Sequence, residues 1–276
     1  MGIDIARHFH QLNYRVAIVG RKAEPGHRLA DELDASRATA DFFPCELQSY
    51  ASQSSLFRAV HQKWNRVDVL AANAGIVDLS SVYLYAHRNK PLSELPPEPD
   101  LSCTDIDYKG VIYGTTLATH FMRHNPTPGG KIIITGSIGA IFPHRSYPEY
   151  CGAKAAVLQF VRGIAPLLKR KENITINCVL PGAVDTPIVP PEMIKAVSPE
   201  CVTKISTVIK AYDEFLLHDE ANDKTGQAVE ASADQIFYYD LPEMANGYKT
   251  ARAVTVWEPL FRAMHGEDSG LEGAIP

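Results

Sequence analysis

Residues 130–154, "GKIIITGSIGAIFPHRSYPEYCGAK", contain a strand, a loop and the start of a helix, in that order. The β-branched run at 130–137 is typical of a strand buried in a parallel sheet. A helix with the sequence "EYCGAKAAVLQFVRGIAPLLKR" follows at 149–170. Because ligands of open α/β sheets bind beyond the carboxyl ends of such strands, this stretch predicts both a fold class and the place of a site.

The same alternation of helices and strands continues over the rest of the chain. Further predicted helices cover 3–12, 27–36, 50–64 and 104–124, and further predicted strands cover 14–20, 39–47, 67–75, 174–182 and 226–232. This order predicts an α/β fold, a doubly wound parallel sheet with crossover helices. We expect one domain over 1–276, with a Pro- and Ser-rich loop excursion at 78–101 and a substrate lid of amphipathic helices at 187–222.

Composition and charge narrow the classes of partner. The 276 residues are 45% hydrophobic and 21% charged, with a formal net charge of -5 and scattered basic residues. We therefore expect a small-molecule partner, and neither a nucleic acid nor a membrane. The five cysteines are far apart without paired spacing, which predicts reduced thiols and a cytoplasmic protein. His8 and His10 lie on different faces of their helix, so no metal site is predicted.

Three residues of the 130–154 stretch carry chemistry. Ser137 follows the strand, Tyr150 lies thirteen residues later, and Lys154 lies one helical turn beyond the tyrosine. The i, i+4 spacing puts Tyr150 and Lys154 on one helix face. A phenol has a pKa of about 10, and a nearby ammonium favours its phenolate form. Ser137 is placed to orient the oxygen of a carbonyl or an alcohol, so the stretch predicts proton transfer to that oxygen.

Each of these residues also has a structural interpretation. A tyrosine near a lysine on a helix is more often a packed surface pair, and a serine after a strand often caps a turn. The joint spacing and the position at the end of a strand favour the catalytic interpretation.

Several motifs in the correct order resemble the short-chain dehydrogenase/reductase family. They are the serine at 137, Tyr-x-x-x-Lys at 150–154, "NAG" at 73–75, "CEL" at 45–47 and "PGAVDTP" at 181–187. "DYKGVIYGT", "PEYCGAKAAVL" and "GQAVEAS" are similar to the subgroup around 15-hydroxyprostaglandin dehydrogenase, which includes many fungal members of secondary metabolism. The resemblance covers nearly all of the chain and implies a Rossmann-like three-layer sandwich. It also implies homo-oligomers in many members, paired through the helices that flank the catalytic strand.

The resemblance assigns roles to individual residues. Tyr150 is the general acid in reduction or the base in oxidation, Ser137 holds the reacting oxygen, and Lys154 lowers the pKa of Tyr150 and binds the nicotinamide ribose. The other residues implied in cofactor binding are Gly2, Arg21, Glu46, Asn73, Val184 and Thr186. Asn73 also suits a tight strand exit without catalysis, and Thr186 equally suits an N-terminal cap of the lid helices.

Asp107 is a first departure from the family pattern. The family has an asparagine there, which holds a water in a proton relay with the lysine. An ionised Asp107 would pair with Lys154 and oppose the depression of the Tyr150 pKa. We therefore expect Asp107 to slow redox turnover without abolishing it.

A second departure lies at the start, "MGIDIARHFH". The family has a strand and a Thr-Gly-x-x-x-Gly-x-Gly loop before this helix, and Gly2 aligns with the last glycine of that loop. Roughly fifteen residues of the family pattern are thus absent, including a central strand. The first strand is therefore predicted to be absent, leaving a gap in the middle of the sheet. Three explanations compete: a start assigned too far downstream, a truncated product, or another segment in the gap, although no downstream segment is spare.

Cofactor choice depends on the residues after the second strand of the family pattern. Gly20 takes the place of the acidic residue of NAD-preferring members, and Arg21 and Lys22 would bind a 2′-phosphate. NADP is therefore expected over NAD, although the two cations also suit a solvated loop. The predicted activity is an NADP(H)-dependent oxidoreductase that interconverts an alcohol and a carbonyl on a small organic molecule. The alternative is a non-redox isomerase or dehydratase, or an inactive binding scaffold.

Overall fold

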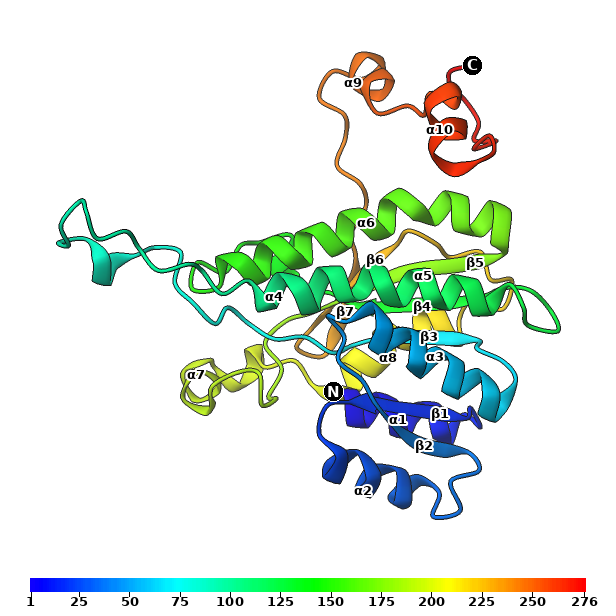
Figure 1. Ribbon diagram of the computed structural model, residues 1–276, viewed down its shortest axis with the longest axis horizontal. Coiled ribbons are helices and arrows are strands. Elements are labelled where there is room, and N and C mark those ends of the chain that lie inside the picture. The colour runs from blue at the N-terminus through cyan, green and yellow to red at the C-terminus, as the bar shows by residue number, and fades with distance from the viewer.

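The computed structural model describes all residues 1–276 and shows an α/β fold with helices on both faces of a largely parallel sheet (Figure 1). The larger sheet has five strands in the order β3-β4-β5-β6-β7. They are β3 (Val69–Ala72), β4 (Gly130–Thr135), β5 (Ile174–Pro181), β6 (Ala228–Ser232) and β7 (Gln235–Tyr238). The first four run parallel, and β7 pairs antiparallel with β6.

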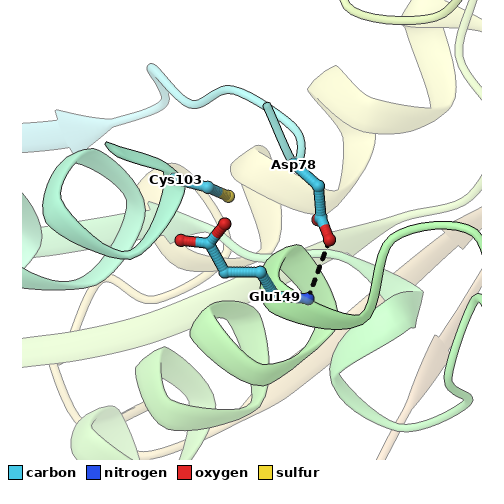
Figure 2. Close-up of side chains that lie close together, drawn as sticks. All are labelled: Asp78, Cys103 and Glu149. Carbon is cyan, nitrogen blue, oxygen red and sulfur yellow. Dashed lines mark hydrogen bonds between the residues drawn. The ribbon is translucent and has the colours of Figure 1, made fainter. Parts of the chain in front are cut away.

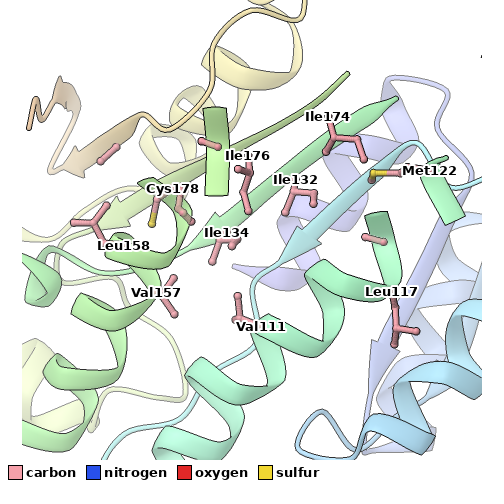
Figure 3. Close-up of a cluster of buried hydrophobic side chains, with 14 of the residues drawn as sticks. Val111, Leu117, Met122, Ile132, Ile134, Val157, Leu158, Ile174, Ile176 and Cys178 are labelled. Carbon is pink, nitrogen blue, oxygen red and sulfur yellow. The ribbon is translucent and has the colours of Figure 1, made fainter. Parts of the chain in front are cut away.

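Two layers of helices bury the two faces of this sheet. The first layer is α3 (Tyr50–Trp64), α5 (Gly110–Met122) and α6 (Pro148–Glu172), and the second is α1 (Gly2–Gln11) and α8 (Ile205–Leu216). Figure 3 shows the core under the first layer, where Val111 and Val157 lie close to Ile134 of β4. Under the second layer, Phe9 and Phe215 are buried in a separate cluster. The three-layer sandwich that the family resemblance implies is therefore present.

The sheet is interrupted between β1 (Val16–Gly20) and β3. β1 pairs only with β2 (Ala40–Pro44), and these two parallel strands form a separate sheet that α2 (Ala23–Leu33) covers. A cavity of about 1160 Å³ is lined by both β1 and β3, with mainly apolar side chains around it. No residue of β1 or β3 is fully buried, whereas every residue of β5 is. Two strand edges thus face a cavity instead of a neighbouring strand.

This interruption lies where the sequence predicts a gap in the sheet. β1 and β3 correspond to the second and fourth strands of the family pattern, between which its first strand would lie. None of the 276 residues forms a strand there, in agreement with the expectation that no downstream segment is spare.

The predicted helix at 104–124 is divided. A short helix, α4 (Ser102–Thr104), passes into a π-helical turn, η2 (Asp105–Lys109), before α5 begins. Periodicity at 3.6 residues per turn cannot distinguish such a turn from a continuous helix. π turns are rare and frequently lie at functional sites, and this one contains Asp107.

The predicted lid at 187–222 is also divided. Its first part holds α7 (Pro191–Ala196) and the 3-10 turn η4 (Pro199–Cys201), neither of which has a buried residue. Its second part is α8, which buries Tyr212 and Phe215 almost completely against the sheet. α8 is therefore a core helix, and 187–204 remains as the candidate lid.

Three other segments lie at the periphery of the fold. The loop excursion at 78–101 projects from the body and contains only a 3-10 turn, η1 (Tyr85–His87) (Figure 1). Beyond β7, the chain ends in α9 (Tyr248–Ala253) and α10 (Glu258–His265), outside the sheet. By length and composition α6 could cross a membrane, but its Val157 and Val161 are fully buried in the core. Such packing is what a core helix of a globular domain shows.

Candidate active site

Ser137, Tyr150 and Lys154 meet beyond the carboxyl end of β4. Ser137 Oγ accepts a hydrogen bond from Gly139 N at 3.0 Å, which fixes the loop after the strand. A Cβ on Gly139 would lie 3.2 Å from Ser137 Oγ and 3.8 Å from Tyr150 Cε1, so the glycine allows the two side chains to approach. Lys154 Nζ lies 5.5 Å from the centroid of the Tyr150 ring. The structure thus brings together the three residues that the sequence singles out.

Lys154 is buried and held by two oxygen atoms. Its Nζ donates to Thr135 O at 3.0 Å and lies 3.1 Å from Asp107 Oδ2. Asp107 is fully buried, and its Oδ1 accepts from Ile76 N at 2.9 Å. Gly75 leaves room for this carboxylate, since a Cβ there would lie 2.7 Å from Oδ2. Asp107 and Lys154 therefore form the ion pair that the sequence predicts.

The charges of this pair act on the phenol of Tyr150. Burial raises the pKa of Tyr150; Lys154 and Ser137 oppose the rise, and Asp107 adds to it. Burial alone would lower the pKa of Lys154, but Asp107 and Tyr150 outweigh burial and raise it. Burial raises the pKa of Asp107 against the effect of the lysine. The negative charge of Asp107 thus weakens the stabilisation of the Tyr150 phenolate by Lys154.

Asn73 connects the end of β3 to the start of α1. Its Oδ1 accepts from Thr135 Oγ1 at 3.2 Å, and Thr135 Oγ1 lies 2.6 Å from the buried hydroxyl of Tyr212 on α8. With Oδ1 engaged, Nδ2 turns toward Gly2, where a Cβ would lie only 2.9 Å from it. A side chain at position 2 would therefore clash with Asn73, so glycine fits best there. Glycine is also the residue expected where the backbone approaches a phosphate.

The two residues expected near the adenosine lie at the carboxyl ends of β1 and β2. Arg21 is exposed and lines the mouth of the cavity directly after β1. Glu46 is exposed after β2, where its Oε2 accepts from Gln48 Nε2 at 3.0 Å. Both side chains are exposed at the carboxyl ends of their strands, the same end of the strands at which Ser137 follows β4.

Val184 and Thr186 follow β5. Val184 is buried in the core cluster with α1 and α8, so only its backbone is available to a ligand. Thr186 Oγ1 donates to Val184 O at 3.4 Å, and α7 begins only at Pro191 with Pro190 before it. The alternative in which Thr186 caps a lid helix is therefore wrong.

Thr135 and Asp78 contact Lys154 and Tyr150 of this site, and no sequence pattern above singles them out. Thr135 contacts Lys154 through its carbonyl and Asn73 through its hydroxyl. A polar residue at the end of an apolar strand is a signal that could have found it. Asp78 accepts from Tyr150 N at 2.8 Å, across 72 residues of sequence. No local pattern indicates such a contact.

A doubly wound sheet with a serine, a tyrosine and a lysine at one strand end defines a Rossmann-type oxidoreductase. The family model described as short chain dehydrogenase matches residues 1–195, so the chain belongs to the short-chain dehydrogenase/reductase family.

Known relatives agree with this assignment. Short-chain dehydrogenase/reductase prx6 of Penicillium rubens is 56% identical over 276 residues, which are 100% of this chain and 91% of that protein. The mouse 15-hydroxyprostaglandin dehydrogenase [NAD(+)] is 28% identical over 178 residues, 63% of this chain and 60% of that protein. An alcohol dehydrogenase of Thermococcus sibiricus, solved with 5-hydroxy-NADP, superposes with a TM-score of 0.64 at 19% identity, over 88% of this chain and 93% of that one. The last of these shows the shared fold alone.

Proposed function

We propose that the chain is an NADP(H)-dependent oxidoreductase that interconverts an alcohol and a carbonyl on a small organic molecule. The approach of Lys154 Nζ to within 5.5 Å of the Tyr150 ring centroid, beside Ser137, carries the proposal. Membership of the short-chain dehydrogenase/reductase family supports redox chemistry. Similarity to a fungal relative supports a role in secondary metabolism.

The three side chains divide the proton chemistry among them. In reduction, the Tyr150 hydroxyl donates its proton to the carbonyl oxygen; in oxidation, its phenolate accepts the proton of the alcohol. Ser137 Oγ donates a hydrogen bond to the same oxygen. Lys154, whose pKa is raised, remains an ammonium and stabilises the phenolate. A bound nicotinamide would supply or accept the hydride.

The residues present fit such a cofactor at its nicotinamide end. Lys154 is the proposed ribose ligand, and Thr135 links it to Asn73, which lines the cavity together with Gly2. Thr186 and the Val184 backbone follow the neighbouring strand β5, where the carboxamide would bind. At the pyrophosphate end, Gly2 lies at the N-terminus of α1, where a phosphate would bind.

The cofactor preference is tested at Arg21. Arg21→Ala should raise the KM for NADPH by about 10- to 100-fold, because a hydrogen bond to a charged group contributes about 1.5–3 kcal/mol. The KM for NADH should stay unchanged, since NADH has no 2′-phosphate. Arg15→Ala, at the opposite end of β1, is the matched control and should change neither value. Steady-state kinetics with both cofactors measures this, and a parent that prefers NADH contradicts the assignment.

Asp107 is tested by Asp107→Asn, which removes the charge and keeps an acceptor for Ile76 N. Because Asp107 raises the pKa of Tyr150, the variant should have a lower Tyr150 pKa. Oxidation needs the phenolate, so its rate rises with pH through this pKa, and reduction needs the phenol, so its rate falls. Both limbs of the pH–rate profile should therefore move to lower pH, and turnover in the oxidation direction near neutral pH should increase by a few fold.

Asp105→Asn is the control for this profile. Asp105 lies in the same π-helical turn, but it pairs with Lys109 at the surface instead of with Lys154. Its replacement should leave both limbs in place. A profile that does not move in Asp107→Asn would show that this carboxylate has no influence on the phenol.

The alternative is a non-redox enzyme or a binding scaffold that uses Ser137 and Tyr150 without nicotinamide. Asp107 favours it, since its carboxylate pairs with Lys154 and raises the pKa of Tyr150. Titration with NADPH and NADH separates the two functions, because a dehydrogenase must bind one of them measurably.

Partner and location complete the proposal. The partner we propose is a small-molecule alcohol or carbonyl, in the cytoplasm. We also propose a homo-oligomer that pairs through α5 and α6, since only 39% of the most apolar stretch of α6 is buried in the single chain. Sedimentation velocity would measure that state.

A further inference from the structure

Asp78, Cys103 and Glu149 form a cluster beside the site that the proposed chemistry does not use (Figure 2). Their ligating atoms lie within 4.8 Å of one another. Cys103 is fully buried, and its Sγ donates to Ile76 O at 3.3 Å. Burial and the nearby carboxylates raise the pKa of this thiol, so it remains a protonated donor. The two carboxylates make hydrogen bonds of their own, and these determine what the cluster does.

Asp78 binds the first turn of α6. Its Oδ1 accepts from Tyr150 N at 2.8 Å and its Oδ2 accepts from Glu149 N at 3.0 Å, the second of which Figure 2 draws. The helix has no cap of its own, because Tyr147 makes no side-chain cap bond and Pro148 has no N–H. A carboxylate from a loop 72 residues away therefore satisfies the amide of Tyr150 itself, at the end of the helix where negative charge is favourable.

Glu149 joins the same turn to the helix that carries Asp107. Its Oε1 accepts from both N and Oγ1 of Thr104, each at 2.9 Å. Thr104 directly precedes the π-helical turn with Asp107. The start of α6 is thus tied to the loop after β3 and to α4, and Tyr150 lies where the three segments meet.

Asp78 is also the first residue of the loop excursion. The neck of this loop is closed by Asp100 N, which donates to Ser80 Oγ at 2.9 Å. Farther out, the Tyr83 hydroxyl donates to Arg145 O at 2.5 Å, in the segment between Ser137 and Tyr150. Asp78 therefore joins the base of the loop excursion to the first turn of α6.

We propose that Asp78 is a positioning residue, whose double cap on α6 fixes the phenol of Tyr150 relative to Ser137 and Lys154. The proposal rests on the proposed function of Tyr150. Loss of the cap frees the first turn of α6 and moves the phenol, while the cofactor site on the other side of Lys154 keeps its geometry. Asp78 should therefore affect turnover more than cofactor binding.

The test compares Asp78→Ala with Ser80→Ala, which alters the neck of the same loop and leaves the cap intact. In Asp78→Ala, hydrogen exchange at the amides of Glu149 and Tyr150 should accelerate by about tenfold or more, because both lose a charged acceptor. The kcat should fall by about 10- to 100-fold with the KM for NADPH unchanged, since a displacement of about 1 Å can reduce the rate that much. Asp78→Asn keeps one carbonyl acceptor and should recover part of both effects.

Unchanged exchange in Asp78→Ala, or faster exchange with the parent kcat, overturns the proposal. An equal loss in Ser80→Ala also overturns it, because disturbance of the loop would then explain the effect. If the parent has no redox activity, the proposed function fails separately, and Tyr150 is titrated by ultraviolet difference against Tyr150→Phe. A phenol pKa that differs between the parent and Asp78→Ala then supports the positioning role, and an identical pKa overturns it.

Discussion

We expect an N-terminal extension of this chain to raise the free energy of unfolding by about 5 kcal/mol or more. The extension consists of about fifteen residues in front of Met1, which form an apolar strand and a glycine-rich loop. β1 and β3 each have one edge that faces the cavity of about 1160 Å³. A parallel strand between them would form hydrogen bonds along both edges, each with a net contribution of about 0.5–1.5 kcal/mol. It would also remove the apolar lining from water at about 25 cal/mol per Å².

The position of α1 makes an upstream extension the suitable form of this experiment. Gly2 lies beside Asn73, and Asn73 is the residue that directly follows β3 in the chain. A strand parallel to β1 and β3 would therefore end next to Met1, and α1 would form its crossover to β1. No such geometry is available to the C-terminal segment, because α9 and α10 lie on the far side of α6 (Figure 1).

The same extension should tighten NADPH binding by about 100-fold or more, equivalent to about 2.7 kcal/mol. A glycine-rich loop in front of Gly2 would supply backbone amides to the pyrophosphate at the N-terminus of α1. Urea denaturation measures the stability and should also show a larger m-value, since more surface is buried on folding. Fluorescence titration measures the cofactor affinity.

An extension of equal composition with two prolines at strand positions is the matched control, because proline cannot pair within a sheet. It should leave both stability and affinity at the values of the parent. If the strand-forming extension also leaves the stability and the cofactor affinity unchanged, no strand binds between β1 and β3.

Local patterns predicted most elements of the fold. α3 has the bounds predicted from the sequence, 50–64. The β-branched run predicted as a strand at 174–182 forms β5. β7 was missed because it pairs through a tight turn at Ala233, which takes φ +48 without the glycine or asparagine that mark such turns. α8 was mistaken for part of a lid, since an amphipathic pattern shows that one face is apolar but not what covers it.

The site shows the same limit. Tyr150 and Lys154 were predictable because one helix fixes their spacing, and Ser137 because strand ends carry ligand sites. The bond from Asp78 to Tyr150 N joins segments that only the tertiary fold brings together. The π-helical turn that directs Asp107 to Lys154 leaves no mark in hydrophobic periodicity. Sequence was therefore sufficient to predict the proposed reacting groups, and the fold was needed to find what holds them.

Replacement of Tyr150 by Phe is expected to lower kcat/KM by about 10²- to 10⁴-fold, the contribution typical of a positioned general acid or base. The ring, its packing beside Gly139 and its neighbour Lys154 are retained, so the affinity for NADPH and the melting temperature should stay close to those of the parent. Stopped-flow measurement of the hydride step, with a cofactor titration beside it, separates the two effects.

Tyr147→Phe is the matched control for Tyr150→Phe. Tyr147 directly precedes α6, its ring is tilted against that of His144 with centroids 5.1 Å apart, and its side chain makes no cap bond to the helix. Its hydroxyl should be dispensable. If Ser137 and Tyr150 act as one unit on the same oxygen, the double variant Ser137→Ala with Tyr150→Phe should lose little more than Tyr150→Phe alone. Full additivity would show instead that the two hydroxyls act in different steps, and parent-level activity in Tyr150→Phe would show that Tyr150 is not the general acid or base.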